Sequence, residues 1–195
     1  IRRDGHLDYS CGAFEGGELV ATGSSFHNTL RCMAVSADHQ GEGLMNQVVY
    51  HLMERQVTLG NSHVFMYTKP QSARMFGDLG FYEIARLDDV VFMENRKDGF
   101  KRWIGSLIPT KKEGQCAAIV MNANPFTKGH RFLVERAASE NDFVHLFLLS
   151  EEAGPIPYAV RKRLVRDGIA DLPNVIFHDS GPYIISSATF PSYFL

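Results

Sequence analysis

The sequence predicts an α/β protein built in two halves, and three observations indicate this. In the second half an apolar run, 116–121, precedes a turn-rich loop and then residues at helical spacing, which is typical of a buried parallel strand leading into a helix. In the first half strand-like segments precede a long amphipathic helix. A polar, turn-rich stretch at 94–114 separates the two patterns, so we expect domains at 1–112 and 113–195.

Composition excludes several classes of protein. The chain has 195 residues, is 45% hydrophobic and carries a formal net charge of -2, so a general nucleic-acid binder is not expected. No apolar run reaches membrane-spanning length and no signal peptide is visible, so we expect a cytoplasmic protein without a membrane partner. Cys11, Cys32 and Cys116 are expected to be buried, reduced thiols. The histidines form no close ligand set, so no metal site is predicted.

The first half is expected to begin with a β-hairpin whose turn is 15–17. Leu44, Val48 and Leu52 recur four residues apart, as do Val49, Met53 and Val57, which predicts a helix ending at Gly60. The remaining expected elements are strands at 9–14, 18–23, 30–35, 64–67 and 90–93, a helix at 71–79 and a short amphipathic helix at 100–108.

The second half is expected to alternate strands and helices. Strands are predicted at 116–121, 144–149 and 174–178, and helices at 130–140 and 158–169. This order implies right-handed crossovers and a doubly wound parallel sheet. Ligands bind such sheets beyond the carboxyl ends of the strands, where the loop at 122–130 would lie.

The segment Thr127-Lys128-Gly129-His130 lies where a strand passes through a loop into a helix. Backbone N–H groups at a helix start attract phosphate, and glycine allows its close approach. A histidine there can donate a hydrogen bond to phosphate oxygens as charge builds on them. The alternative is an unrelated loop with a surface histidine. The helix at 158–169 is basic, and either it presents a solvated face or Arg161 reaches a triphosphate.

The same four residues resemble the H-x-G-H motif of the nucleotidyltransferase superfamily in its T-x-G-H variant. Members close the site with a second signature, often I-S-S-T-x-x-R, which 185–189 does not reproduce because Ala188 precedes the threonine. We therefore interpret 183–195 as a local core or substrate-lining segment. The chain begins with Ile1 and stops inside an apolar segment, so we expect a fragment whose nucleotidyltransferase domain is incomplete at its C-terminus.

The first half resembles the GNAT-type N-acetyltransferase fold, whose pyrophosphate loop has the pattern Q/R-x-x-G-x-G/A. Gln40 and Gly43 match it, whereas Met45 replaces the final small residue and Glu42 adds negative charge. The resemblance implies a coenzyme-A-like arm bound by Val35, Gln40, Gly41, Gly43 and Leu44. The alternative is a GNAT-shaped domain that no longer acetylates anything.

The combination of the two halves resembles the citrate lyase ligase family. The matching segments are 120–130, 145–148, 157–158 and 183–194. The resemblance implies an acid-thiol ligase that forms acetyl-adenylate and pyrophosphate from acetate and ATP. It then acetylates the prosthetic-group thiol of the citrate lyase acyl carrier subunit, releasing AMP.

The resemblance also implies roles for individual residues. His130 and Thr127 would be catalytic, and the nucleotide would contact Asn122, Asn124, Phe126, Lys128 and Gly129. We add Arg161 to the nucleotide-binding residues because it comes early in the basic helix. ATP with Mg²⁺ would be a substrate, and no tightly bound cofactor is expected. Three alternatives stay open: a cofactor adenylyltransferase with an appended domain, a GNAT-type acetyltransferase, and a non-catalytic adaptor that docks the carrier.

Overall fold

The computed structural model describes residues 7–152 and 154–194 and shows a mixed α/β fold, as expected. The chain divides into two compact units, Ile1–Phe100 and Lys101–Leu195. The division falls inside the polar stretch 94–114. The expected domain bounds of 1–112 and 113–195 stay predictions.

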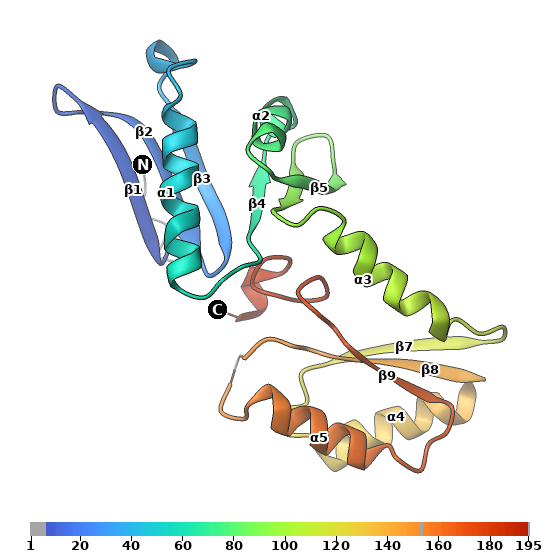
Figure 1. Cartoon of the computed structure of the whole chain (residues 1–195). Coiled ribbons are helices and arrows are strands. Elements are labelled where there is room, and N and C mark those ends of the chain that lie inside the picture. Colours follow the sequence, from blue (N-terminus) through green and yellow to red (C-terminus); the bar gives the residue numbers. More distant parts are fainter. Residues whose placement is uncertain (1–6, 153, 195) are drawn as a thin grey trace. The chain divides into compact units, whose positions relative to one another are not determined.

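The described residues of unit 1 form a sheet with the helices α1 and α2, and α3 begins at the unit's end (Figure 1). Its elements in chain order are β1 (Tyr9–Glu15), β2 (Glu18–Phe26), β3 (Thr29–Val35), η1 (Ala37–His39), α1 (Leu44–Thr58), β4 (Phe65–Thr68), η2 (Pro70–Ser72), α2 (Ala73–Asp78), β5 (Tyr82–Arg86) and β6 (Val91–Glu94). Strand β5 was not predicted, because most of its residues are exposed and it lacks an apolar alternation.

The six strands form one sheet in the order β1-β2-β3-β4-β6-β5. All neighbours are antiparallel except β3 and β4, which are parallel. The β3–β4 pairing is short, since only Thr29 with Phe65 and Leu30 with Met66 are in register. The two strands part beyond these residues, and the separation is visible in Figure 1.

Helix α1 packs on the sheet through an apolar stripe. Val48, Val49 and Leu52 are buried in the core of unit 1, as their four-residue spacing predicts. Val57 was expected on that stripe but is 67% exposed, and the buried position in the last turn of the helix is taken by Gln56. Gly60, at a φ of 82°, ends the helix with the N–H of Gly60 on the Val57 carbonyl and that of Asn61 on the Gln56 carbonyl.

The chain continues through α3 (Gly99–Leu107) and η3 (Ile108–Thr110) into the sheet of unit 2. The elements of unit 2 are β7 (Cys116–Met121), α4 (Lys128–Glu140), β8 (Phe143–Leu148), α5 (Tyr158–Gly168), β9 (Val175–Asp179) and η4 (Pro191–Phe194). The three strands are parallel in the order β7-β8-β9. Each boundary of the three strands and of α4 and α5 lies within two residues of the predicted one, whereas η4 was not predicted.

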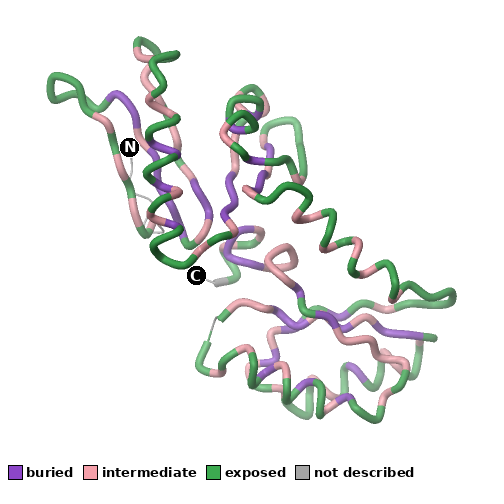
Figure 2. Tube along the Cα trace, in the orientation of Figure 1, coloured by how far each residue is buried: buried purple, intermediate pink, exposed green. Residues whose placement is uncertain are grey.

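Helices α4 and α5 cover the same face of the three-stranded sheet (Figure 1). Val134 of α4 and Val165 of α5 pack with Val144, Leu146 and Leu148 of β8 in one cluster. In both units the buried stretches follow mainly the strands, and the helices keep exposed outer faces (Figure 2). A doubly wound sheet has helices on both of its faces. In the described residues of unit 2 both α4 and α5 lie on one face, so the doubly wound arrangement stays a prediction.

The cysteines differ from expectation. All three are free thiols, but Cys32 and Cys116 are exposed and Cys11 is partly buried. Their apolar neighbours suggested burial, yet Cys32 and Cys116 fall at strand positions that face away from the two cores. No helix within the described ranges is long and apolar enough to cross a membrane. Those ranges also hold no group of three or more potential metal ligands.

Candidate functional site

The start of α4 is organised by a reciprocal pair of side chains. Thr127 is the N-cap residue, and its hydroxyl oxygen accepts a hydrogen bond from the His130 backbone N–H at 3.5 Å. In return His130 Nδ1 accepts from the Thr127 backbone N–H at 3.0 Å and lies 2.8 Å from Thr127 Oγ1. This is a capping box in which histidine takes the place that glutamate usually fills.

The capping box determines which nitrogen of His130 can act on a ligand. Because Nδ1 accepts from a backbone N–H, the proton of the neutral imidazole lies on Nε2. The Phe126 ring stacks against the imidazole at 5.9 Å between ring centroids and an interplanar angle of 24°. Phe126 in turn packs against the core of unit 2. The imidazole is therefore held by a core-anchored ring, with Nε2–H left as its donor.

Gly129 and Lys128 lie on the exposed first turn of α4. A Cβ built on Gly129 would meet only Thr127 Oγ1 within 4 Å, at an ordinary contact distance of 3.7 Å. The protein itself therefore leaves room for a side chain at this position. Any requirement for glycine would come from a ligand lying against the backbone N–H groups that open the helix.

Asn122, Asn124 and Phe126 belong to the loop between β7 and α4, as predicted. Asn122 and Asn124 are partly buried, and the Asn122 carbonyl and side-chain oxygens both accept from Arg161, at 2.7 and 3.1 Å. The loop thus begins at a residue fixed to α5. Seven of the predicted residues lie on one short segment, 122–130.

Arg161 requires a correction. We expected it to reach a triphosphate, but it is 0% exposed, and its guanidinium donates to protein carbonyl groups throughout. The alternative of a solvated helix face fails for Arg161 but describes the other arginines of this helix. Arg161 follows the first turn of α5 on its inner side, next to Val165, whereas Arg163 and Arg166 are exposed.

A second polar group lies at the carboxyl ends of β8 and β9 and was not predicted. The Tyr158 hydroxyl donates to Asp179, and Lys162 Nζ lies 2.7 Å from the same carboxylate. Burial and the bond to Asp179 raise the pKa of Tyr158 above its ordinary value. Burial opposes ionisation of Asp179, but the bonds from Lys162 and Tyr158 outweigh it and lower its pKa. Tyr158 and Lys162 are four residues apart on α5, but no spacing in the sequence joins them to Asp179.

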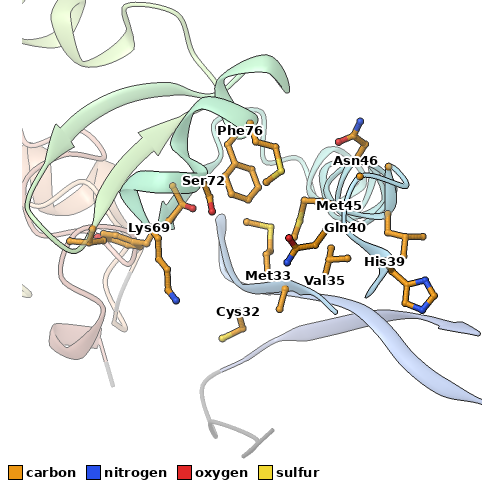
Figure 3. Close-up of a pocket in the computed structure, with 18 of the residues that line it drawn as sticks. Cys32, Met33, Val35, His39, Gln40, Met45, Asn46, Lys69, Ser72 and Phe76 are labelled. Atoms are coloured by element: carbon orange, nitrogen blue, oxygen red, sulfur yellow. The ribbon is translucent and has the colours of Figure 1, made fainter. Parts of the chain in front are cut away.

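Unit 1 contains a cavity of about 830 Å³ in the wedge where β3 and β4 part (Figure 3). All five residues predicted to hold a coenzyme-A-like arm line it: Val35, Gln40, Gly41, Gly43 and Leu44. The opposite wall comes from β4, η2 with its N-cap residue, and α2, and includes Lys69, Ser72 and Phe76, which the sequence did not identify. Figure 3 shows Met33 and Met45 between these walls, so part of the lining is apolar and flexible.

The loop before α1 has a backbone that favours glycine. Gly41 and Gly43 adopt φ angles of 91° and 78°, and Gly43 caps α1 without a side-chain hydrogen bond. Glu42 was expected to repel phosphate, but its carboxylate lies 3.0 Å from His39 Nδ1. This bond raises the pKa of His39, so the negative charge of Glu42 is partly balanced when His39 is protonated.

Comparison with known proteins supports one family. Residues 116–195 match the family described as the citrate lyase ligase C-terminal domain. The chain is 42% identical over 179 residues to a citrate pro-3S-lyase ligase of Klebsiella pneumoniae, covering 91% of this chain and 52% of that protein. It is 36% identical over 198 residues to one of Haemophilus influenzae, covering 100% and 59%. The chain thus spans about half the length of these relatives.

The solved structures that resemble the chain include N-acetyltransferases. One is a GCN5-related N-acetyltransferase of Rhodopseudomonas palustris, with a TM-score of 0.42 and 14% identity, covering 45% of this chain and 61% of that structure.

Proposed function

Because the chain belongs to the citrate lyase ligase family, we propose that the protein activates acetate with ATP and acetylates the citrate lyase acyl carrier subunit. In the first half-reaction an acetate oxygen attacks the α-phosphorus, the bond to the β-phosphate breaks and pyrophosphate leaves. In the second, the prosthetic-group thiol attacks the acetyl carbon, its proton is lost to solvent and AMP leaves.

The observation that carries this proposal is the capping box of Thr127 and His130 after a parallel strand. Nε2–H of His130 can donate to the α-phosphate as charge accumulates in the transition state. The exposed backbone N–H groups of Lys128 and Gly129 can hold neighbouring phosphate oxygens. ATP enters with Mg²⁺, which its own phosphates and water hold in large part. This is the nucleotidyltransferase chemistry that T-x-G-H implies.

The cavity of unit 1 is the proposed site of the coenzyme-A-like arm. Its size suits a cofactor, since small-molecule sites occupy roughly 300–1,000 Å³. The lining contains one positive charge, on Lys69, and one negative charge, on Asp89, beside apolar side chains. In this proposal unit 1 has the GNAT-type fold and binds the arm without transferring acetyl groups itself. A cytoplasmic location belongs to the proposal as well, because the carrier thiol must stay reduced.

The products distinguish this proposal from the alternatives. The full-length protein, incubated with ATP, Mg²⁺ and acetate but no carrier, should yield acetyl-adenylate and pyrophosphate. With the carrier added, mass spectrometry should show one acetyl group on its prosthetic arm, together with AMP. A stable dinucleotide product would instead indicate a cofactor adenylyltransferase. Carrier acetylation from acetyl-coenzyme A without ATP would indicate a GNAT-type acetyltransferase.

A further inference from the structure

Arg161 is a fully buried cation whose hydrogen-bond acceptors are mostly backbone carbonyls. Its Nε donates to the Ile156 carbonyl at 3.2 Å, and its Nη2 to the Glu151 carbonyl at 2.7 Å. Its Nη1 is shared between the carbonyls of Asn122, at 2.7 Å, and Leu149, at 3.0 Å. Within the described part of the chain Arg161 has no carboxylate partner. Carbonyl oxygens therefore compensate for its desolvation.

These acceptors lie on the two loops that leave the carboxyl edge of the sheet. Asn122 is the first residue after β7, and Leu149 is the first after β8. The Leu149 N–H also bonds the Met121 carbonyl at 3.0 Å, so the two loops start side by side. One guanidinium thus joins the loop that leads to His130 and the loop that leads to α5.

The connection extends to a third segment through Glu151. Its carbonyl accepts from Arg161, and its carboxylate accepts from the Ser187 N–H at 2.9 and 2.6 Å. Ser187 is 2% exposed, although it lies in a segment of turns without a helix or strand. Arg161 is therefore the centre of a hydrogen-bonded frame that reaches segments more than 60 residues apart in sequence.

We propose that Arg161 is a positioning residue that fixes the 122–127 loop, and through it His130, for nucleotide chemistry. Only the planar guanidinium fork can serve these acceptors at once, because lysine has three donors at a single point. Asn122 is held at both its carbonyl and its side-chain oxygen, which fixes the loop at its first residue. The expected effect of Arg161 on the reaction rate rests on the proposed function, whereas its effect on the loop does not.

The kinetic test compares Arg161→Lys and Arg161→Met with Arg163→Met, a control on the exposed side of the same helix. ATP–pyrophosphate exchange is measured with acetate, at a temperature where every variant is folded by circular dichroism. Misplacing reacting groups by about 1 Å can cost about 100-fold in rate, so we expect kcat to fall roughly 10- to 100-fold for both Arg161 variants. Arg163→Met should stay within about twofold of wild type.

A double-mutant cycle separates positioning from a general loss of structure. If Arg161 acts through His130, then Arg161→Lys should lower the rate of His130→Ala by less than about threefold, because residues that act as a unit are non-additive. Two results would overturn the inference. One is an exchange rate of Arg161→Lys equal to that of wild type. The other is a double variant whose loss of rate equals the product of the losses of the two single variants.

Hydrogen exchange of the backbone amides tests the loop without any reaction. In the absence of nucleotide, the amides of 123–130 should exchange faster in Arg161→Lys than in wild type and in Arg163→Met. Unchanged protection of this segment would show that the loop does not depend on Arg161. If wild type lacked pyrophosphate exchange, the proposed function would fail while the amide data still decided the structural role of Arg161.

Discussion

His130 has two proposed roles, helix capping and phosphate binding, and each uses a different ring nitrogen. Its Nδ1 accepts from the Thr127 N–H and completes the start of α4, which leaves Nε2–H for a ligand. A mutation at this position therefore affects both the helix and the site. Substitutions that preserve the capping box can separate the two effects.

The first prediction uses His130→Glu with His130→Ala. Glutamate at this position restores an ordinary capping box, so thermal stability should stay close to wild type. Its carboxylate cannot donate to phosphate and repels it, so acetate-dependent pyrophosphate exchange should fall by at least the 10²–10³-fold expected for His130→Ala. ATP affinity of His130→Ala, measured by calorimetry, should change much less. Near-normal exchange by either variant would remove His130 from the mechanism.

Gly129 offers the second prediction. Alanine fits there without a steric conflict and favours helix by roughly 0.5–1 kcal/mol over glycine, so Gly129→Ala should not lower the melting temperature. It should nevertheless weaken ATP binding, because its methyl group occupies the approach to the first-turn N–H groups. Gly105→Ala is the matched control, since a Cβ on Gly105 of α3 meets nothing within 4 Å and so causes no steric conflict either. Equal ATP affinity in both variants would show that no phosphate lies against Gly129.

At the scale of elements, the parting of β3 and β4 creates the cavity of unit 1. Filling it tests its proposed role, but Gly43→Trp is a poor probe because the φ of 78° at Gly43 strains any side chain. Ala34 on β3 lines the same cavity and has no such constraint. Ala34→Trp should slow acetyl transfer to the carrier thiol while acetyl-adenylate formation persists. Val57→Trp, at an exposed position of α1 outside the cavity, should affect neither.

The outcome of that experiment is read from two separate assays, pyrophosphate exchange and acetylation of the carrier. If Ala34→Trp leaves both at the level of Val57→Trp, the cavity has no part in transfer. The alternative of a GNAT-shaped unit without a ligand would then hold.

Strands β8 and β9 bring two histidines together, and this predicts a dependence of stability on pH. His145 Nδ1 and His178 Nε2 are 2.8 Å apart. Burial, followed by repulsion from a charged His145, lowers the pKa of His178 below its ordinary 6.5. The unfolded chain then binds more protons than the folded one below that pH, so the free energy of unfolding falls as the pH decreases from about 6.5.

Urea denaturation at several pH values between 8 and 5 checks this prediction. His178→Gln removes one of the histidines whose pKa is lowered in the fold, so its unfolding free energy should decline less over the same range. His51→Gln, which removes an exposed histidine of α1, should retain the wild-type slope. An identical slope in His178→Gln and wild type would show that His178 does not contribute.

Features formed by residues close together in the sequence could be predicted, and features formed by distant residues could not. The strand-loop-helix order around Thr127–His130 and the glycines before α1 are local, and their geometry follows from turn and capping preferences. The burial of Arg161 could not be seen, because its acceptors lie on loops up to 39 residues away. The far wall of the cavity was also hidden, since Lys69 and Phe76 reach it only through the pairing of β3 with β4.

At the scale of the whole molecule, two units with different proposed tasks lie in one chain. Unit 2 would form the acyl-adenylate, and unit 1 would hold the arm that receives the acetyl group. Unit 2 alone would suffice for the first half-reaction, which forms acetyl-adenylate. Unit 1 alone would form neither acetyl-adenylate nor the acetylated carrier. The central claim is therefore the activation of acetate at the segment 122–130.

ATP–pyrophosphate exchange by the full-length protein, measured with and without acetate, tests this claim most directly. We predict exchange that requires acetate and Mg²⁺, that needs no carrier subunit, and that His130→Glu abolishes while it stays folded. Exchange that is absent with acetate, or that proceeds equally without it, would contradict the account.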